Sequence, residues 1–194
     1  MSISSAANSP PLIVAHRGVS EDFPENTSAA FAAAIDSRAD AIECDLQLTT
    51  DGQIVVCHDF GLQRYGHPDV IVSETSLQDL QRLDIGSWFA PQFSAERLLS
   101  LEQMLQNHGH RMPLWLEVKV PSGGESRIDH FCRKLVQTLA EYDLQHRVTV
   151  LSFDRSVLRR VSELDSEIEL TLNTHQPQAL TAADQAEKLA AMEP

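Results

Sequence analysis

Cysteine and basic residues are both scarce in this sequence of 194 residues. The three cysteines, Cys44, Cys57 and Cys132, leave one thiol unpaired in any disulfide scheme, and their spacing is not that of a metal site. We therefore predict buried, reduced thiols in a cytoplasmic protein. Lysine and arginine total 15 against 28 acidic residues, a formal net charge of −13. This charge argues against nonspecific binding of nucleic acid or of anionic lipid surfaces.

Long apolar runs are missing as well. No segment reaches the ~20 apolar residues of a membrane span, and residues 1–11 lack the basic and apolar regions of a signal peptide. We expect no stable membrane insertion. At 42% hydrophobic residues the chain can bury a substantial core, and residues 1–194 are predicted to form a single domain.

The stretch 41–59 organises the rest of the chain. Glu43 and Asp45 alternate with the apolar residues Ile42, Cys44 and Leu46, which is the pattern of a β-strand with both acids on one face. Two like charges on one strand face repel each other unless a cation lies between them. The pattern therefore indicates a cation site on this face.

The same stretch turns back on itself at Asp51-Gly52, a strong hairpin signal. If Thr50 pairs with Gln53, then Asp45 lies directly opposite His58 on the same face, with Cβ atoms ~5 Å apart. Two acids and an imidazole are then expected to converge. Cys44 and Cys57 are expected to point to the opposite, apolar face and to serve packing.

Strand and helix patterns alternate along the chain. Strands are predicted over 12–15, 41–48, 114–120, 148–153 and 168–173, and helices over 28–37, 76–83, 101–106, 155–164 and 182–192, with a further helix after 124. This alternation is typical of a parallel α/β architecture. In such folds the site lies at the carboxyl ends of the strands. Charged side chains gather at these predicted ends: His16, Arg17, Glu43, Asp45, His58, Glu117 and Lys119.

These side chains have the chemistry needed to cleave a phosphodiester. Carboxylates are hard oxygen ligands, which favour Mg²⁺ or Ca²⁺ over zinc. Arg17 and Lys119 are cations suited to phosphate oxygens. His16 and His58 can act as general base and general acid, since an unperturbed imidazole titrates near neutral pH. A plainer reading treats Glu117 and Lys119 as an ion pair on an exposed edge.

An ordered set of motifs carries a family resemblance. The set is His16-Arg17-Gly18, Pro24-Glu25-Asn26-Thr27, Glu43-x-Asp45, Val55-Val56-x-His58-Asp59 and Glu117-Val118-Lys119. Over about residues 12–173 the chain resembles the glycerophosphodiester phosphodiesterase family. Within the second motif we expect Glu25 and Asn26 to fix the loop and cap the following helix rather than to touch substrate, and Thr27 is an alternative cap.

The resemblance implies a TIM-type (β/α) barrel that hydrolyses glycerophosphodiesters to sn-glycerol 3-phosphate and an alcohol. Its partner would be a small-molecule substrate. It further implies one divalent cation, Mg²⁺ or Ca²⁺, held by Glu43, Asp45 and Glu117. His16 and His58 would do the acid and base work, and Arg17 and Lys119 would hold the phosphate.

The chain departs from the family pattern at its carboxyl end. Family members usually continue through further strands, whereas this chain stops at Pro194. We therefore expect a barrel that lacks its last closing strands and is C-terminally short, either incomplete as given or closed by another chain in a homo-oligomer. Residues 60–112 are expected to form an insertion or loop region that sets the choice of head group.

Two alternative functions remain open from the sequence. A lysophospholipase D-like hydrolase would keep the chemistry but needs an apolar, membrane-facing loop, for which residues 60–97 offer Trp88-Phe89. An inactive phosphate-binding or metal-binding remnant of the family is suggested by the missing closing strands.

Overall fold

The computed structural model describes residues 11–120 and 124–174. Its centre is a sheet in which every neighbouring pair along the main path is parallel. In spatial order the strands are β1 (Val14–His16), β2 (Ala41–Leu48), β4 (Leu114–Val118), β5 (Val148–Ser152) and β6 (Glu169–Leu172). The predicted parallel α/β architecture is confirmed, with strands at the predicted places and slightly shorter.

Strand β3 (Ile54–Val56) lies outside this path and runs antiparallel to β2. Strand β1 pairs with residues 41–43 of β2 and β3 pairs with residues 46–48, while β4 occupies the other edge. Strands β1 and β3 therefore pair with successive parts of the same edge of β2.

The predicted hairpin register is wrong by one residue. Thr49, not Thr50, pairs with Gln53, which leaves a three-residue turn with Gly52 at φ +72°. The residue opposite Asp45 is consequently Cys57, whose N–H donates to the Asp45 carbonyl at 2.9 Å. Cys57 thus lies on the acidic side of the sheet, contrary to the prediction, but it still serves packing because it belongs to a second apolar cluster. Cys44 is packed in the main core as predicted.

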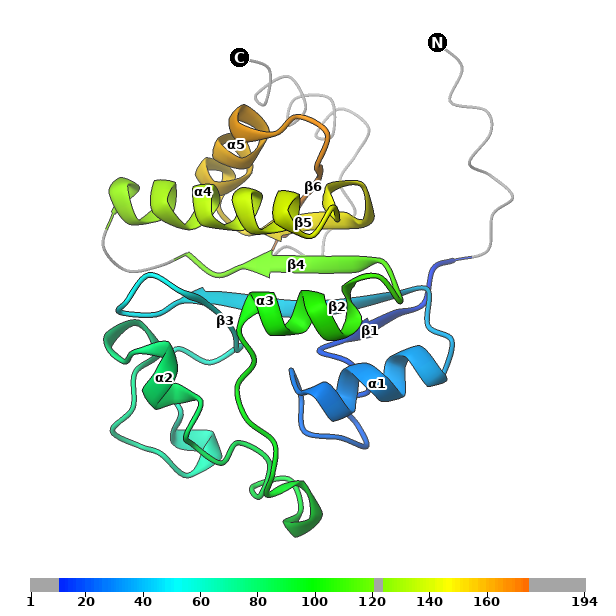
Figure 1. Ribbon diagram of the computed structural model, residues 1–194, viewed down its shortest axis with the longest axis vertical. Coiled ribbons are helices and arrows are strands. Elements are labelled where there is room, and N and C mark those ends of the chain that lie inside the picture. The colour runs from blue at the N-terminus through cyan, green and yellow to red at the C-terminus, as the bar shows by residue number, and fades with distance from the viewer. Residues whose placement is uncertain (1–10, 121–123, 175–194) are drawn as a thin grey trace.

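Helices cover the apolar face of the sheet (Figure 1). They are α1 (Ser28–Asp36), α3 (Leu101–Met104), the π-helix η5 (Leu105–Gly109), α4 (Glu125–Glu141) and α5 (Arg155–Leu164). Phe31, Met104, Phe131 and Val157 from these helices pack against Ile42 and its neighbours in one core cluster. The predicted 182–192 helix lies outside the described residues.

Residues 60–98 form short turns around a second apolar cluster. The turns are α2 (Leu77–Leu80) and the 3₁₀ helices η2 (Gln63–Tyr65), η3 (Val72–Glu74) and η4 (Pro91–Phe93); a further one, η6 (Gln145–Arg147), precedes β5. Helix α2 ends at Leu80 rather than at the predicted 83, because Leu83 N–H bonds to the Leu80 carbonyl and so tightens the last turn. The cluster, which includes Val55, Leu62 and Ile85, packs against the side of β3 that faces away from the main core.

Within residues 11–120 and 124–174, the sheet does not close on itself, because β1 and β6 pair on one edge only. Strand β6 is correspondingly less buried than β2, β4 and β5. No helix in these ranges has the length and hydropathy that crossing a bilayer requires.

Candidate active site

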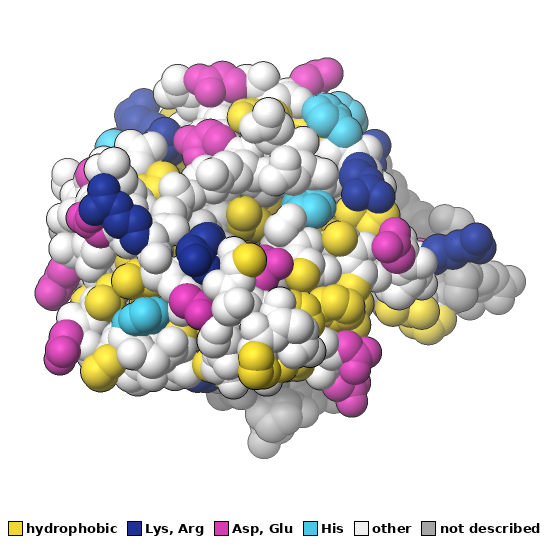
Figure 2. Space-filling model, turned by 60° about the horizontal axis from the view of Figure 1, so that its bottom comes forward, with side chains coloured by type: hydrophobic (Ala, Val, Ile, Leu, Met, Phe, Trp, Pro, Cys, Tyr) yellow, Lys and Arg dark blue, Asp and Glu magenta, His cyan; other side chains and the backbone are white. Residues whose placement is uncertain are grey.

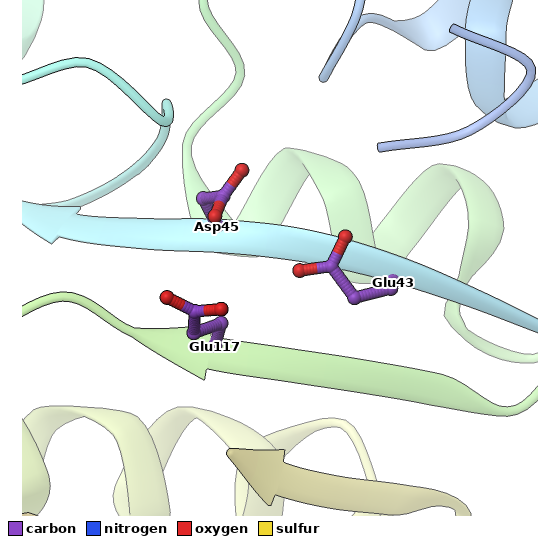
Figure 3. A group of neighbouring side chains, drawn as sticks. All are labelled: Glu43, Asp45 and Glu117. Atoms are coloured by element: carbon purple, nitrogen blue, oxygen red, sulfur yellow. The ribbon is translucent and has the colours of Figure 1, made fainter. Parts of the chain in front are cut away.

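Three carboxylates converge on the side of the sheet that faces away from the helices. Glu43 and Asp45 come from β2 and Glu117 from β4, where Asp45 and Glu117 are direct parallel-register partners. One ligand oxygen from each lies within 4.8 Å of the others, and none of the three residues is more than 9% exposed (Figure 3). The predicted convergence of these acids is therefore present in the structure.

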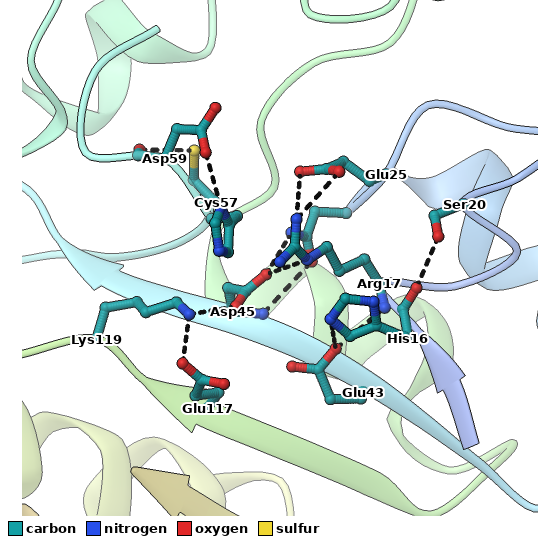
Figure 4. A network of polar contacts seen from close by, with 12 residues as sticks. His16, Arg17, Ser20, Glu25, Glu43, Asp45, Cys57, Asp59, Glu117 and Lys119 are labelled. Atoms are coloured by element: carbon teal, nitrogen blue, oxygen red, sulfur yellow. Dashed lines mark hydrogen bonds and ion pairs between the residues drawn. The ribbon is translucent and has the colours of Figure 1, made fainter. Parts of the chain in front are cut away.

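The buried carboxylates repel one another. Burial, together with the neighbouring Asp45 charge, raises the pKa of Glu43 to about 8. The Lys119 ammonium contacts Glu117 and lies 2.9 Å from Oδ1 of Asp45 (Figure 4). That Asp45 oxygen is buried yet accepts no well-aligned hydrogen bond among the described residues. Three hard oxygen donors with an incompletely satisfied buried charge fit a divalent cation such as Mg²⁺ or Ca²⁺.

Two side-chain amides orient the outer oxygens of this group. Asn26 Nδ2 donates to Asp45 Oδ2 at 2.9 Å, and Asn173 Nδ2 donates to Glu117 Oε2 at 3.0 Å. Of the two predicted caps, Thr27 is the N-cap of α1, and the capping role of Asn26 is wrong. Asn26 adopts φ 57°, which turns its amide toward the acids instead.

The two predicted imidazoles lie near enough to each other for their charges to interact, and His16 also lies beside the acids. His16, at the end of β1, is 66% exposed in its side chain, and its Nε2 lies 3.9 Å from Glu43 Oε2. Partial desolvation and the neighbouring Arg17 charge lower the pKa of His16, and His58 adds to the lowering. His58 follows β3, and its Nδ1 lies 2.7 Å from Asp59 Oδ1. Because a carboxylate can only accept, Nδ1 carries the proton and Nε2 is left for chemistry.

Arg17 ties the first strand to the acids. Its backbone, in the left-handed region at φ 59°, donates from N–H to the Glu43 carbonyl at 3.0 Å and to Glu43 Oε2 at 3.1 Å. Its guanidinium Nε lies 3.1 Å from Asp45 Oδ2, and Nη1 donates to both Glu25 oxygens at 3.2 Å (Figure 4). The two predicted phosphate-binding cations, Arg17 and Lys119, therefore both emerge within the acidic group.

Several residues around the site were not singled out from the sequence. Gln47 donates to the carbonyls of Cys57, His58 and Asp59 at 2.8–3.1 Å and so fixes the segment that carries the imidazole. Asp59 could have been found from its place directly after His58 in the motif. Arg64 and Asn173 have no such local signal, because their partners are distant in the chain.

A cavity of about 410 Å³ adjoins the acidic group at Lys119 and Gln47. Its remaining walls are Leu48, Phe60, Ile71, Ser73, Glu74 and Val120. On the face drawn in Figure 2, acidic and basic side chains are interspersed with apolar ones and form no continuous basic patch. The cavity, by contrast, has an apolar wall with one cation and one anion.

Parallel strands joined by helices, with the polar groups at the carboxyl side of the sheet, are the arrangement of a (β/α) barrel of the TIM type, here open within the described residues. The chain matches the model of the glycerophosphoryl diester phosphodiesterase family over residues 16–193. The chain belongs to this family, as the motifs predicted. The TIM-type fold is confirmed by the solved structures described next.

Relatives and solved structures agree with this assignment. The Bacillus subtilis protein YhdW is 38% identical over 162 residues, which cover 84% of this chain and 65% of that protein. The glycerophosphodiester phosphodiesterase of Caldanaerobacter subterraneus subsp. tengcongensis is 34% identical over 83% of this chain and 65% of its own length. The chain thus spans just under two thirds of these relatives.

Among solved structures, an Oleispira antarctica phosphodiesterase in complex with the product sn-glycerol-3-phosphate superposes with a TM-score of 0.82. It is 29% identical, and the match covers 94% of this chain and 72% of that one. The Thermotoga maritima glycerophosphodiester phosphodiesterase shares the fold at a TM-score of 0.71 and 21% identity, covering 96% and 73%.

Proposed function

We propose that this chain hydrolyses glycerophosphodiesters to sn-glycerol 3-phosphate and an alcohol in a metal-dependent reaction. The observation that carries the proposal is the meeting of three buried carboxylates with two imidazoles and two cations on one side of the sheet. The Oleispira antarctica phosphodiesterase, which was solved with sn-glycerol-3-phosphate, supports the choice of product.

Glu43, Asp45 and Glu117 would hold the divalent cation. When bound, such an ion offsets negative charge on the phosphate oxygens. The ion would also offset the burial and the Asp45 charge that together raise the pKa of Glu43 to about 8. Amide donors from Asn26 and Asn173 keep the outer carboxylate oxygens in fixed orientations.

The side chains of this chain would divide the remaining work. Arg17 and Lys119 bind the nonbridging phosphate oxygens and stabilise charge that develops there. His16, whose pKa is lowered, accepts the proton of the attacking oxygen as that oxygen bonds to phosphorus. His58, entering the step as an imidazolium with a proton on each ring nitrogen, donates the Nε2 proton to the alcohol oxygen as the bond from phosphorus to that oxygen breaks. Asp59 accepts from Nδ1–H, which orients the ring and leaves the Nδ1–H tautomer once Nε2 has given up its proton.

The alcohol would leave through the cavity beside Lys119. A phosphate held by Lys119 would have its ester substituent beside this cavity, whose lining includes Phe60, Ile71 and Glu74. The aromatic and aliphatic walls accommodate methyl and methylene groups, and Glu74 accommodates positive charge. We therefore choose glycerophosphocholine as the first substrate to test.

Release of sn-glycerol 3-phosphate from glycerophosphocholine, with Mg²⁺ or Ca²⁺ and with excess chelator, tests the proposal. Release that requires the ion supports it. Tight metal binding without turnover would favour an inactive remnant, and turnover that survives the chelator would remove the three acids as ligands.

Lysophosphatidylcholine in a parallel assay tests the lysophospholipase D-like alternative. The aromatic pair that suggested this alternative has a structural explanation, since the Trp88 ring packs against Tyr65 at 5.6 Å and against Phe89 at 5.7 Å. Faster turnover of the lysophospholipid than of glycerophosphocholine would restore it.

A further inference from the structure

Arg64 links two parts of the site that come from separate segments of the chain. We infer that Arg64 is a positioning residue, which holds His58 and Arg17 in their working orientations through the carboxylates of Asp59 and Glu25. The inference rests on the proposed function, because it concerns the imidazole and the guanidinium to which that function assigns roles.

The contacts of Arg64 form one continuous chain of charges. Its Nε donates to Asp59 Oδ2 at 2.8 Å, and the other oxygen of Asp59 lies 2.7 Å from His58 Nδ1. Its Nη1 and Nη2 donate to the two Glu25 oxygens at 3.0 and 2.5 Å. Those same oxygens accept from Arg17 Nη1 at 3.2 Å. One guanidinium therefore restrains both carboxylates that orient the proposed catalytic groups.

The guanidinium itself is held by two aromatic rings. The Arg64 Cζ atom lies 5.0 Å from the centroid of Tyr65 and 5.2 Å from that of Trp88. The Tyr65 hydroxyl also accepts from Nη2 at 3.0 Å and donates to Glu25 at 3.3 Å. Stacking and hydrogen bonding together limit rotation of the Arg64 side chain. A side chain must itself be fixed in this way before it can hold Asp59 and Glu25 in place.

The geometry demands arginine rather than positive charge alone. A planar guanidinium can donate from Nε to one carboxylate and from both Nη atoms to another, whereas an ammonium is a point charge on a flexible stem. Lysine at this position could satisfy Asp59 or Glu25 but could not hold both in a fixed relation. Loss of that relation shifts His58 and Arg17 independently of each other.

The test compares Arg64→Met, Arg64→Lys and a control, Arg82→Met. Arg82 lies in the same loop region and also pairs with a carboxylate, Asp79 at 3.1 Å, but its side chain is 67% exposed. For both Arg64 variants we expect kcat for glycerophosphocholine to fall about 10- to 100-fold, because small misplacement of a catalytic group has effects of that size. We also expect KM to rise, since Arg17 loses its orientation. The control should match the wild type.

Two readouts separate positioning from a merely structural role. Partial unfolding lowers kcat in proportion to the folded fraction, measured by circular dichroism, and leaves KM unchanged. The Nδ1–H proton of His58, observed by NMR in the free protein and assigned by its loss in His58→Ala, should shift or broaden in both Arg64 variants and stay in place in Arg82→Met.

Wild-type kcat, KM and proton signal in Arg64→Lys would overturn the inference, as would losses explained wholly by the folded fraction. A wild-type chain without diesterase activity would refute the proposed function instead. The NMR signal would then still decide whether Arg64 orients His58.

Discussion

Several ionisable residues at this site are buried next to other charges, which ordinary surface residues are not. Glu43 is the clearest case, because burial and the adjacent Asp45 raise its pKa to about 8, from 4.5 for a free glutamate. A carboxyl group in that state resists ionisation until a cation is supplied. Metal binding and proton release are therefore coupled at this residue.

The raised pKa of Glu43 predicts a pH-dependent stability in the presence of chelator. The folded state binds the Glu43 proton more tightly than the unfolded state, so this contribution is fully present below pH 4.5 and is lost as the pH rises toward 8. We expect the wild-type melting temperature to fall across this window. The fall should be smaller in Glu43→Gln, which cannot ionise. Equal pH dependence in the two proteins would contradict the prediction.

The two histidines are predicted to matter for turnover and not for folding. His16→Ala and His58→Ala should each lower kcat by ~10² to 10⁴-fold, the usual contribution of a general acid or base. The 66% exposure of the His16 side chain means that its removal leaves packing intact. Steady-state kinetics with glycerophosphocholine, together with circular dichroism, check both variants. Wild-type rates in either variant would remove that residue from the mechanism.

At the scale of elements, the loop between β1 and α1 delivers three site residues within one short segment. Arg17, Glu25 and Asn26 all contact other charged groups, and the loop closes at Thr27, the N-cap of α1. The Thr27 hydroxyl accepts from Ala30 N–H at 3.3 Å and donates to the Pro24 carbonyl at 2.6 Å. One buried hydroxyl thus joins the start of the helix to the loop.

Replacing this hydroxyl should destabilise the protein measurably. We expect Thr27→Ala to lower the free energy of unfolding by about 1–2 kcal/mol, the usual range for loss of an N-cap. Thr27→Ser keeps the hydroxyl and should lose less. Urea denaturation followed by circular dichroism measures both. Equal losses in the two variants would show that the methyl group, which both lack, and not the cap is what counts.

At the scale of the whole molecule, a net charge of −13 opposes binding of an anionic substrate. Local cations offset this repulsion at the site. Arg17 and Lys119 lie among the acids, and a divalent ion would add further positive charge. Because the buried acids repel one another, the free energy of unfolding should also depend on whether the ion is bound. An ion that binds the folded chain and not the unfolded one shifts the unfolding equilibrium by mass action.

Metal addition should therefore raise the melting temperature. At an ion concentration of about 100 times the Kd, the stabilisation is ~2.7 kcal/mol, or roughly 5–10 °C for a chain of this size. Asp45→Asn should abolish most of this shift, while Asp79→Asn, at an exposed site, should keep it. Differential scanning calorimetry with Mg²⁺, Ca²⁺ and chelator makes the comparison. An undiminished shift in Asp45→Asn would exclude that residue as a ligand.

Much of this protein could be predicted from local sequence patterns. Strand alternation placed Glu43 and Asp45 on one face, and local helix patterns placed the starts of α1 and α3, because both depend on residues only a few positions apart. The ordered motifs identified the family and with it the TIM-type fold. The expected lack of closure agrees with the open sheet of the described residues.

The tertiary structure decided what depends on distant parts of the chain. The hairpin register differed by one residue because a three-residue turn with Gly52 replaced the expected two-residue turn, and this moved Cys57 opposite Asp45. The link from Arg64 to Glu25 spans 39 positions, and the one from Asn173 to Glu117 spans 56. Periodicity carries no information about such pairs, since only the packing of the strands and loops brings their side chains together.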